Sequence, residues 1–245
     1  MKKKYRLTDE TIEFNGVKLY RIEALRDFGD VKKGDKGGFV QSEKNLSQFG
    51  NCWIYGDAKV FNYAYVSCDA ICECSSLIYG HARVADNARI FHNSKVHGYS
   101  CILENAYISN YSNVYGTACI RGNAFIRNNS TIHDDVEVYG NAIISGTSIV
   151  RGDSKVFGEA EICDALIERS SDYIVFKNWW SSLRYVTWTR SNNMWKVGCF
   201  YGTGEELIEK AYKDSELSGR EYKRVVEYVE SILRDENQNK VIINL

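Results

Sequence analysis

Hydrophobic positions recur at every sixth residue through the middle of the chain. From Ile54 to Ile162 the series has 19 members, and 18 of them are isoleucine or valine. The residue two places before each member is nearly always small, and the residue two places after it is often Gly, Asn or Asp. No α-helix fits this period, because its faces repeat at about 3.6 residues. Short strands that end at tight corners do fit, with inward side chains at alternate positions.

A self-similarity of six residues predicts a hexapeptide β-helix. Residues 114–119 show one unit, in which an aliphatic residue, a glycine and a small residue share the hexad. The chain resembles hexapeptide-repeat proteins on this pattern. The resemblance implies a mainly β fold, a left-handed parallel β-helix of triangular section. It also implies a homotrimer. With three hexads in each coil, the series predicts about six coils.

Two other segments flank the repeat, which gives three predicted parts: residues 1–50, 51–168 and 169–245. The first reads as a capping β segment, with a hairpin turn at Asn15–Gly16. The last reads as a small α+β module with strands over residues 173–180, 183–190 and 194–201. Capping boxes at Thr203–Glu206 and Ser218–Glu221 then predict two helices.

The C-terminal module concentrates aromatic and basic residues, including four of the five tryptophans. Rings that stack on a planar group, beside cations that bind phosphate, suit a small anionic, nucleotide-like ligand. The predicted ligand-binding residues are Trp179, Trp180, Arg184, Tyr185, Trp188, Arg190, Trp195 and Lys196. In the competing interpretation the tryptophans form a core beneath the helices and the cations are solvated.

Both ends of the chain also resemble one group of hexapeptide-repeat proteins, found in phages and in prophage regions of Gram-positive bacteria. Residues 6–47 are similar to the leader of that group, and residues 178–222 to its tail. The resemblance implies an accessory protein of viral origin in the cytoplasm of a bacterial host. Together with the aromatic and basic cluster, it suggests a non-catalytic trimer that sequesters a host immune signal, as a sponge against antiviral defence.

An enzyme is the alternative function. Hexapeptide-repeat acyltransferases transfer an acyl group from coenzyme A, with a histidine as general base. The repeat predicts that His81, His97 and His133 lie on or beside one prism face. The unbroken hexad series, however, leaves no inserted loop to cover a pantetheine arm. A trimeric zinc enzyme fits less well, because the pair His92–His97 has no third histidine at the required offset.

A purely structural or protein-binding module is the third alternative. A net charge of −1 argues against general binding of nucleic acid, and no apolar run reaches membrane-spanning length. We expect no cofactor and no metal site. The eight cysteines include no C-x-x-C pair, so they are predicted to be small buried hydrophobic residues. Proline is absent from the chain, as suits the stacked coils, in which most strand N–H groups donate to the next coil.

Overall fold

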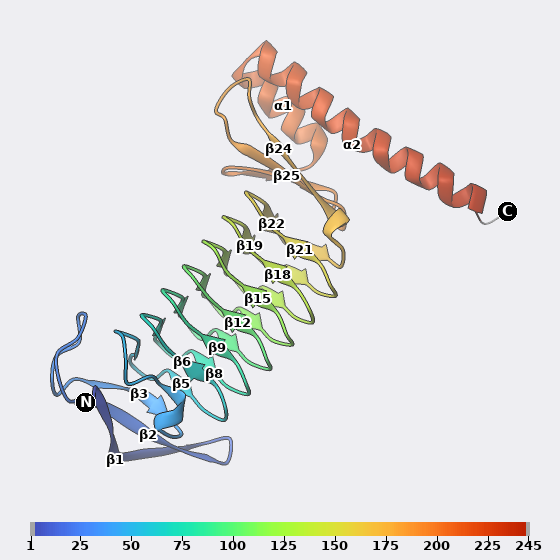
Figure 1. Ribbon diagram of the computed structural model, residues 1–245. Coiled ribbons are helices and arrows are strands. Elements are labelled where there is room, and N and C mark those ends of the chain that lie inside the picture. Colours follow the sequence, from blue (N-terminus) through green and yellow to red (C-terminus); the bar gives the residue numbers. More distant parts are fainter. Residues whose placement is uncertain (1–2, 244–245) are drawn as a thin grey trace. The chain divides into compact units, whose positions relative to one another are not determined.

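The computed structural model describes residues 3–243, and the side chains of residues 3–236. The chain divides into two compact units, Met1–Asp172 and Tyr173–Leu245. The first unit is a parallel β-solenoid (Figure 1), which confirms the predicted fold class. It has about seven turns where the repeat predicts about six. Strand pairing continues past both ends of the hexad series, to Phe39 and to Ile167.

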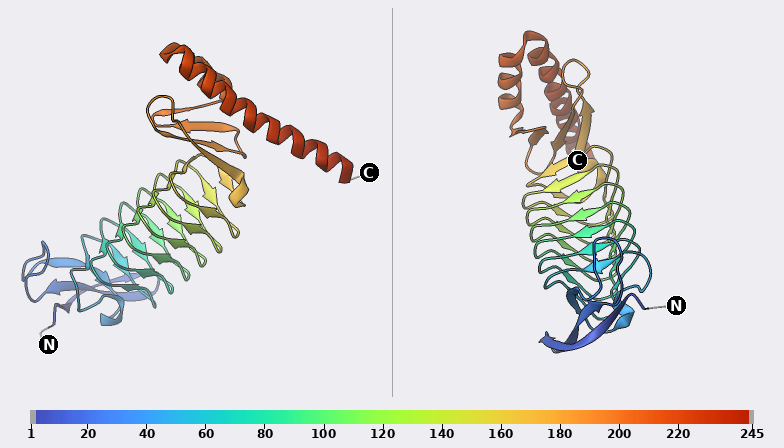
Figure 2. Two further views of the ribbon diagram at one scale, coloured as in Figure 1. Left: turned by 45° about the horizontal axis from the view of Figure 1, so that its top comes forward. Right: turned by 90° about the vertical axis from the view of Figure 1, so that its left-hand side faces the viewer.

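Three parallel sheets form the solenoid walls, and consecutive coils stack in register (Figure 2). The first wall contains β4 (Trp53–Ile54), β7 (Ile71–Cys72), β10 (Arg89–Ile90), β13 (Tyr107–Ile108), β16 (Phe125–Ile126), β19 (Ile143–Ser145) and β22 (Glu161–Cys163). The second contains β5 (Lys59–Val60), β8 (Leu77–Ile78), β11 (Lys95–Val96), β14 (Asn113–Val114), β17 (Thr131–Ile132), β20 (Ile149–Val150) and β23 (Leu166–Ile167). The third contains β6 (Tyr65–Val66), β9 (Arg83–Val84), β12 (Cys101–Ile102), β15 (Cys119–Ile120), β18 (Glu137–Val138) and β21 (Lys155–Val156).

The inward side chains make a narrow apolar core. The aliphatic series from Ile54 to Ile162 is fully buried, and the small residues two places earlier leave room for it. Each corner turns the chain tightly and approaches the next coil. At Gly116 the backbone φ is +71°, and a Cβ would lie 2.6 Å from the backbone nitrogen of Asp134. At this corner glycine is therefore favoured by both conformation and space, whereas other corners carry Asn, Asp or Cys at positive φ.

An N-terminal hairpin extends the second wall. β1 (Tyr5–Phe14) and β2 (Val17–Ala24) pair antiparallel around the predicted turn, where Asn15 and Gly16 have φ of 51° and 74°. β3 (Lys36–Val40) then pairs with β2 and, in parallel, with β5. A short helix, η1 (Glu43–Asn45), leads into the first coil, and η2 (Ser170–Asp172) follows the last strand.

Lys4 is fully buried at the hairpin end of the solenoid. Its ammonium group donates to the carbonyl oxygen of Cys52 at 2.9 Å and to that of Phe49 at 3.3 Å. Burial lowers the pKa of Lys4. A charged group removed from water is tolerated only where it is hydrogen-bonded, so these carbonyl groups explain its position.

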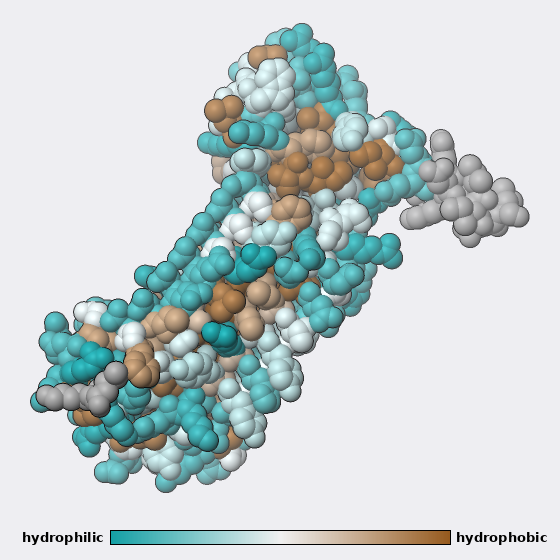
Figure 3. Space-filling view, in the orientation of Figure 1, coloured by the Kyte–Doolittle hydropathy of each residue, from teal (hydrophilic) through white to brown (hydrophobic). Residues whose placement is uncertain are grey.

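The second unit is an antiparallel sheet packed against two helices. The strands are β24 (Tyr173–Lys177), β25 (Tyr185–Thr189), β26 (Met194–Val197) and β27 (Phe200–Gly202), and the helices are α1 (Gly204–Asp214) and α2 (Glu216–Ile243). The sequence predicts three strands, but a turn at Gly198 (φ 56°) splits the last of them into β26 and β27. Exposed apolar side chains gather on the visible side of this unit (Figure 3).

The helix starts agree with the sequence in one case and differ in the other. The capping box of Thr203 and Glu206 is present at α1. The expected start at Ser218 is wrong, because α2 begins at Glu216 and Ser218 lies inside it. The Ser215 hydroxyl accepts a hydrogen bond from the Ser218 N–H at 3.1 Å. Ser215 therefore caps a free N–H group in the first turn of α2.

The cysteine prediction is also wrong for most positions. Only Cys52 and Cys72 are buried, whereas Cys68, Cys74 and Cys199 are exposed and the rest are half-buried. Cys68 and Cys74 occupy corners with φ of 60°, and Cys101 and Cys119 face outward from adjacent strands. In the part of the chain that the structure describes, no helix is both long enough and apolar enough to cross a membrane.

The inward series carries the stability of the solenoid. We expect Ile132→Ala to lower the free energy of unfolding by about 2–5 kcal/mol, because Ile132 is fully buried and its loss leaves a cavity. Ile149 lies one coil further on but is 41% exposed, so Ile149→Ala is the matched control. Urea unfolding followed by circular dichroism measures both. Equal losses in the two variants would contradict the inward assignment.

Candidate functional site

A column of stacked aromatic rings runs along the second wall of the solenoid, just after its strands. Its members occur at every eighteenth residue and stack almost parallel, with interplanar angles of 5–7°. The column comprises Phe61, Tyr79, His97, Tyr115 and His133. A second, shorter column across the adjacent corner comprises Tyr63, His81 and Tyr99. The three histidines named by the sequence analysis therefore lie on and beside one face.

His133 has the environment of a general base. Its Nδ1 lies 2.9 Å from Asp134 Oδ1, and the other oxygen of Asp134 accepts the backbone N–H of Gly152 at 3.1 Å. A carboxylate accepts, so this contact favours a ring proton on Nδ1 and places Nε2 on the other side of the ring. These hydrogen bonds, led by that from His133, lower the pKa of Asp134, so the carboxylate stays ionised. Stacking on Tyr115, at 4.9 Å between ring centroids, holds the ring plane.

His97 is placed differently in the same column. Its ring lies between Tyr79 and Tyr115, at 4.6 and 5.0 Å between centroids, and its Nε2 is 3.1 Å from Asn113 Oδ1. Partial burial lowers the pKa of His97, although the contact with Asn113 opposes the shift. The imidazole is therefore neutral at neutral pH, with an amide rather than a carboxylate as its partner.

The remaining histidines have simpler surroundings. His81 is exposed and stacks between Tyr63 and Tyr99, at 4.7 and 4.6 Å. His92 is an exposed corner residue with φ of 44°. Among the residues that the structure describes, no three His, Cys, Asp or Glu side chains are grouped to hold a metal ion.

In the C-terminal unit the structure separates the predicted ligand-binding residues. Trp188 and Trp195 are 1% and 2% exposed and pack with Leu207, Val226 and other core residues beneath the helices. Of the four alternating residues, Val186 and Trp188 of β25 belong to this core, whereas Arg184 and Arg190 flank the strand. These two tryptophans have the positions that the core interpretation describes.

The other predicted residues lie around that core. Arg190 pairs with Glu236 of α2 at 2.7 Å, and the Lys196 ammonium group donates to the carbonyl of Gly198. The ammonium group of Lys177 lies over the Tyr185 ring, 5.7 Å from the ring centroid. Trp180 is half-buried against Tyr222, whereas Trp179 is 69% exposed. Their role in binding stays a prediction.

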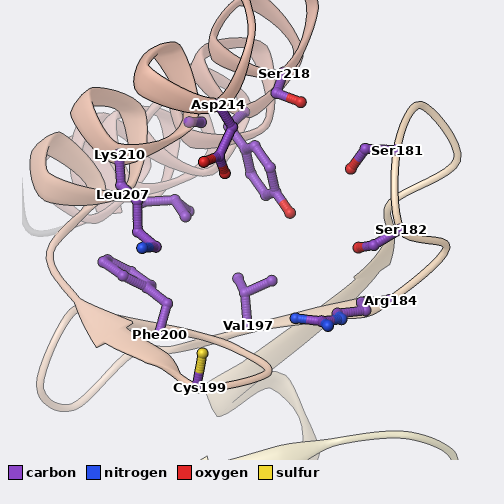
Figure 4. Close-up of a pocket in the computed structure, with 12 residues that line it drawn as sticks. Ser181, Ser182, Arg184, Val197, Cys199, Phe200, Leu207, Lys210, Asp214 and Ser218 are labelled. Carbon is purple, nitrogen blue, oxygen red and sulfur yellow. The ribbon is translucent and has the colours of Figure 1, made fainter.

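Arg184 lines a pocket between the sheet and α1 of this unit (Figure 4), with a cavity of about 210 Å³. Lys210 and Asp214 reach it from α1, and Ser181 and Ser182 from the loop before β25. Val197, Phe200 and Leu207 add apolar surface. Arg184 and Lys210 form no ion pair within the described residues. The pocket thus offers two unpaired cations beside an apolar surface.

Sequence reasoning missed several of these groups. Asp134 directly follows His133, so the adjacent pair was a visible signal for an oriented base. Ser181, Lys210 and Tyr222 come from separate elements, and no local pattern joins them. They meet only because α1 and α2 fold back over the sheet.

The comparisons with known proteins agree with the fold. No known protein-family profile matches the chain. A stretch of 97 residues is 36% identical to a protein of Escherichia coli (strain K12) described as "Uncharacterized acetyltransferase YdcK". That match covers 36% of this chain and 30% of the relative, so the chain spans about a third of the relative's length. The fold is therefore that of a hexapeptide-repeat β-solenoid, and about a third of the chain is similar to a protein described as an acetyltransferase.

The burial of His97 predicts a pH effect. We expect its pKa to lie below 6.5, since partial burial disfavours the imidazolium. The folded protein then binds this proton less readily than the unfolded chain. The resulting contribution to stability is present above about pH 6.5 and is lost as the pH falls through the folded-state pKa. NMR titration of the histidine ring protons measures the pKa, with the His97 signal identified by its loss in His97→Gln. A pKa of 6.5 or higher for His97 contradicts the expected downward shift.

Proposed function

We propose that the protein transfers an acyl group from an acyl-coenzyme A thioester to an amine or hydroxyl acceptor, with His133 as general base. The observation that carries the proposal is the pair His133–Asp134 on a solenoid wall, in which the carboxylate contacts Nδ1 and leaves Nε2 as the ring atom for a substrate proton. The similar Escherichia coli protein is described as an acetyltransferase, and this description supports acyl transfer as the reaction class. The homotrimer implied by the resemblance remains part of this proposal.

The proposed step needs only groups that this wall supplies. The acceptor attacks the carbonyl carbon of the thioester while His133 Nε2 takes its proton. The carbon–sulfur bond then breaks, and the imidazolium returns the proton to the departing thiolate. Asp134 acts as a positioning residue, because it fixes the ring tautomer and stabilises the imidazolium.

The face on which this step occurs is open. Strand pairing with an 18-residue offset is continuous from β4 to β22, all within the described residues, and no inserted loop interrupts it. The thioester must therefore approach along the solenoid wall. A wall that no inserted loop encloses suits an acceptor too large to enter a closed cleft.

Replacement of the base tests the proposal. We expect His133→Gln to lower kcat/KM for transfer from acetyl-coenzyme A by about 100-fold or more, because general-base catalysis is lost. Release of the coenzyme A thiol, measured over a panel of amine and hydroxyl acceptors, is the assay. His81→Gln, in the neighbouring column, is the matched control and should retain activity. No thiol release above background with any acceptor, or full activity in His133→Gln, refutes the proposal.

The second candidate is non-catalytic: sequestration of a small anionic, nucleotide-like ligand by the C-terminal unit, as a viral sponge for a host signal. The unpaired Arg184 and Lys210 at one pocket favour it, as does the exposed ring of Trp179. Sequestration requires no catalytic turnover, so this candidate function does not depend on His133.

Native mass spectrometry tests this candidate on protein purified from bacterial cells without added ligand. We expect a stoichiometric bound mass that disappears in Arg184→Met, since a charge-assisted contact is lost. Protein that consistently carries no small molecule would argue against sequestration.

A further inference from the structure

The pocket of Figure 4 contains a prearranged set of hydrogen-bond donors built around Asn178, which is 1% exposed. Its side-chain amide donates to the Ser181 hydroxyl oxygen and to the Tyr222 hydroxyl oxygen, both at 2.8 Å. Its amide oxygen accepts the Ser181 backbone N–H at 3.0 Å. Because both hydroxyl oxygens already accept a hydrogen bond from Asn178, their own hydrogens remain to donate.

Arg184 adds a third donor at the same end of the pocket. The Asn178 N–H donates to the Arg184 carbonyl at 2.8 Å, which closes the loop that carries both residues. The guanidinium lies against Gly198, where a Cβ would come within 2.8 Å of its Nη1. Two hydroxyl hydrogens and one guanidinium therefore line one end of the pocket, and such donors suit an oxyanion.

The opposite side of the pocket is of mixed character. Lys210 and Asp214 lie on α1, across from Ser182 and Arg184 (Figure 4). Val197, Phe200 and Leu207 provide the apolar surface between the two sides. A ligand with an oxyanion at one end and an apolar body satisfies both regions.

Size limits the ligand further. The cavity of about 210 Å³ is smaller than the roughly 300–1,000 Å³ typical of pockets that enclose drug-sized ligands. A dinucleotide or coenzyme A therefore does not fit inside it. Trp188 and Trp195, buried in the core, offer no stacking surface to a base.

We infer that this pocket binds a compact amphipathic anion, a single ring or short chain that bears one carboxylate or phosphate group. The inference rests on the second candidate function, anion binding by the C-terminal unit, and narrows the ligand from a nucleotide to a smaller molecule. Asn178 is its positioning residue, and Arg184, Ser181 and Tyr222 contact the oxyanion.

Cys199 provides a direct readout, because it is exposed and lines the pocket. The probes are phenyl phosphate, benzoate and the neutral benzamide. We expect phenyl phosphate or benzoate at saturation to slow the alkylation of Cys199 by iodoacetamide by about tenfold or more. Cys68 and Cys74, exposed corners of the solenoid unit, are internal controls and should react at unchanged rates. The more protective of the two anions decides between phosphate and carboxylate.

Variants test the donors. Arg184→Met should remove protection, and Ser181→Ala or Tyr222→Phe should weaken binding about fivefold or more, each judged by the rate with and without probe. Lys213→Met, an exposed lysine of α1 outside the pocket lining, is the control and should bind normally. Equal protection by benzamide, or no protection by either anion, overturns the inference.

The outcome is distinguishable from that of the second candidate. Protection of Cys199 by an anion, with no cell-derived ligand in native mass spectrometry, supports the pocket and contradicts sequestration. A co-purifying nucleotide on protein whose Cys199 is unprotected by either anion overturns the pocket and leaves sequestration standing.

Discussion

The structure of the first unit depends on one repeated interaction, the backbone hydrogen bond from each strand to the coil that follows. His97 N–H donates to Val114 O at 2.9 Å, and His133 N–H to Val150 O at 3.0 Å. Because the offset hardly varies from 18 residues, side chains at equal offsets lie above one another. The aliphatic core, the glycine corners and the aromatic column all follow from this register.

The register also determines where chemistry is possible. Inward positions are filled by aliphatic and small side chains, so the charged and imidazole groups of the walls point outward. A stacked column then limits ring rotation, since each imidazole lies beside a tyrosine ring at 4.6–5.0 Å. What distinguishes His133 from His97 is the neighbouring corner residue. Asp134 occupies the corner with φ of 63°, and its carboxylate also accepts a hydrogen bond from the His133 imidazole.

Much of the solenoid could be predicted because the sequence repeats the same local rule. The hexad series gives the walls, the inward residues and the shared face of the three histidines. It misses the outer coils, because β3 and β23 pair with the solenoid without matching the hexad spacing. The absence of proline agrees with walls in which nearly every N–H donates.

The C-terminal unit was less predictable because its site depends on tertiary contacts. Alternation predicts that Arg184 and Trp188 share one side of a strand but does not say whether that side meets solvent or helices. Packing under α1 and α2 buries Trp188 and leaves Arg184 at the edge of the core. Asn178 gives no signal in the sequence, since its role comes from two hydroxyl groups 3 and 44 residues away.

A crystal structure of the protein with bound coenzyme A tests the central claim, acyl transfer at His133, most directly. The account predicts that the thiol sulfur lies within hydrogen-bonding reach of His133 Nε2, on the solenoid wall beside Tyr115. Coenzyme A bound elsewhere on the chain, with its thiol remote from His133, would contradict it.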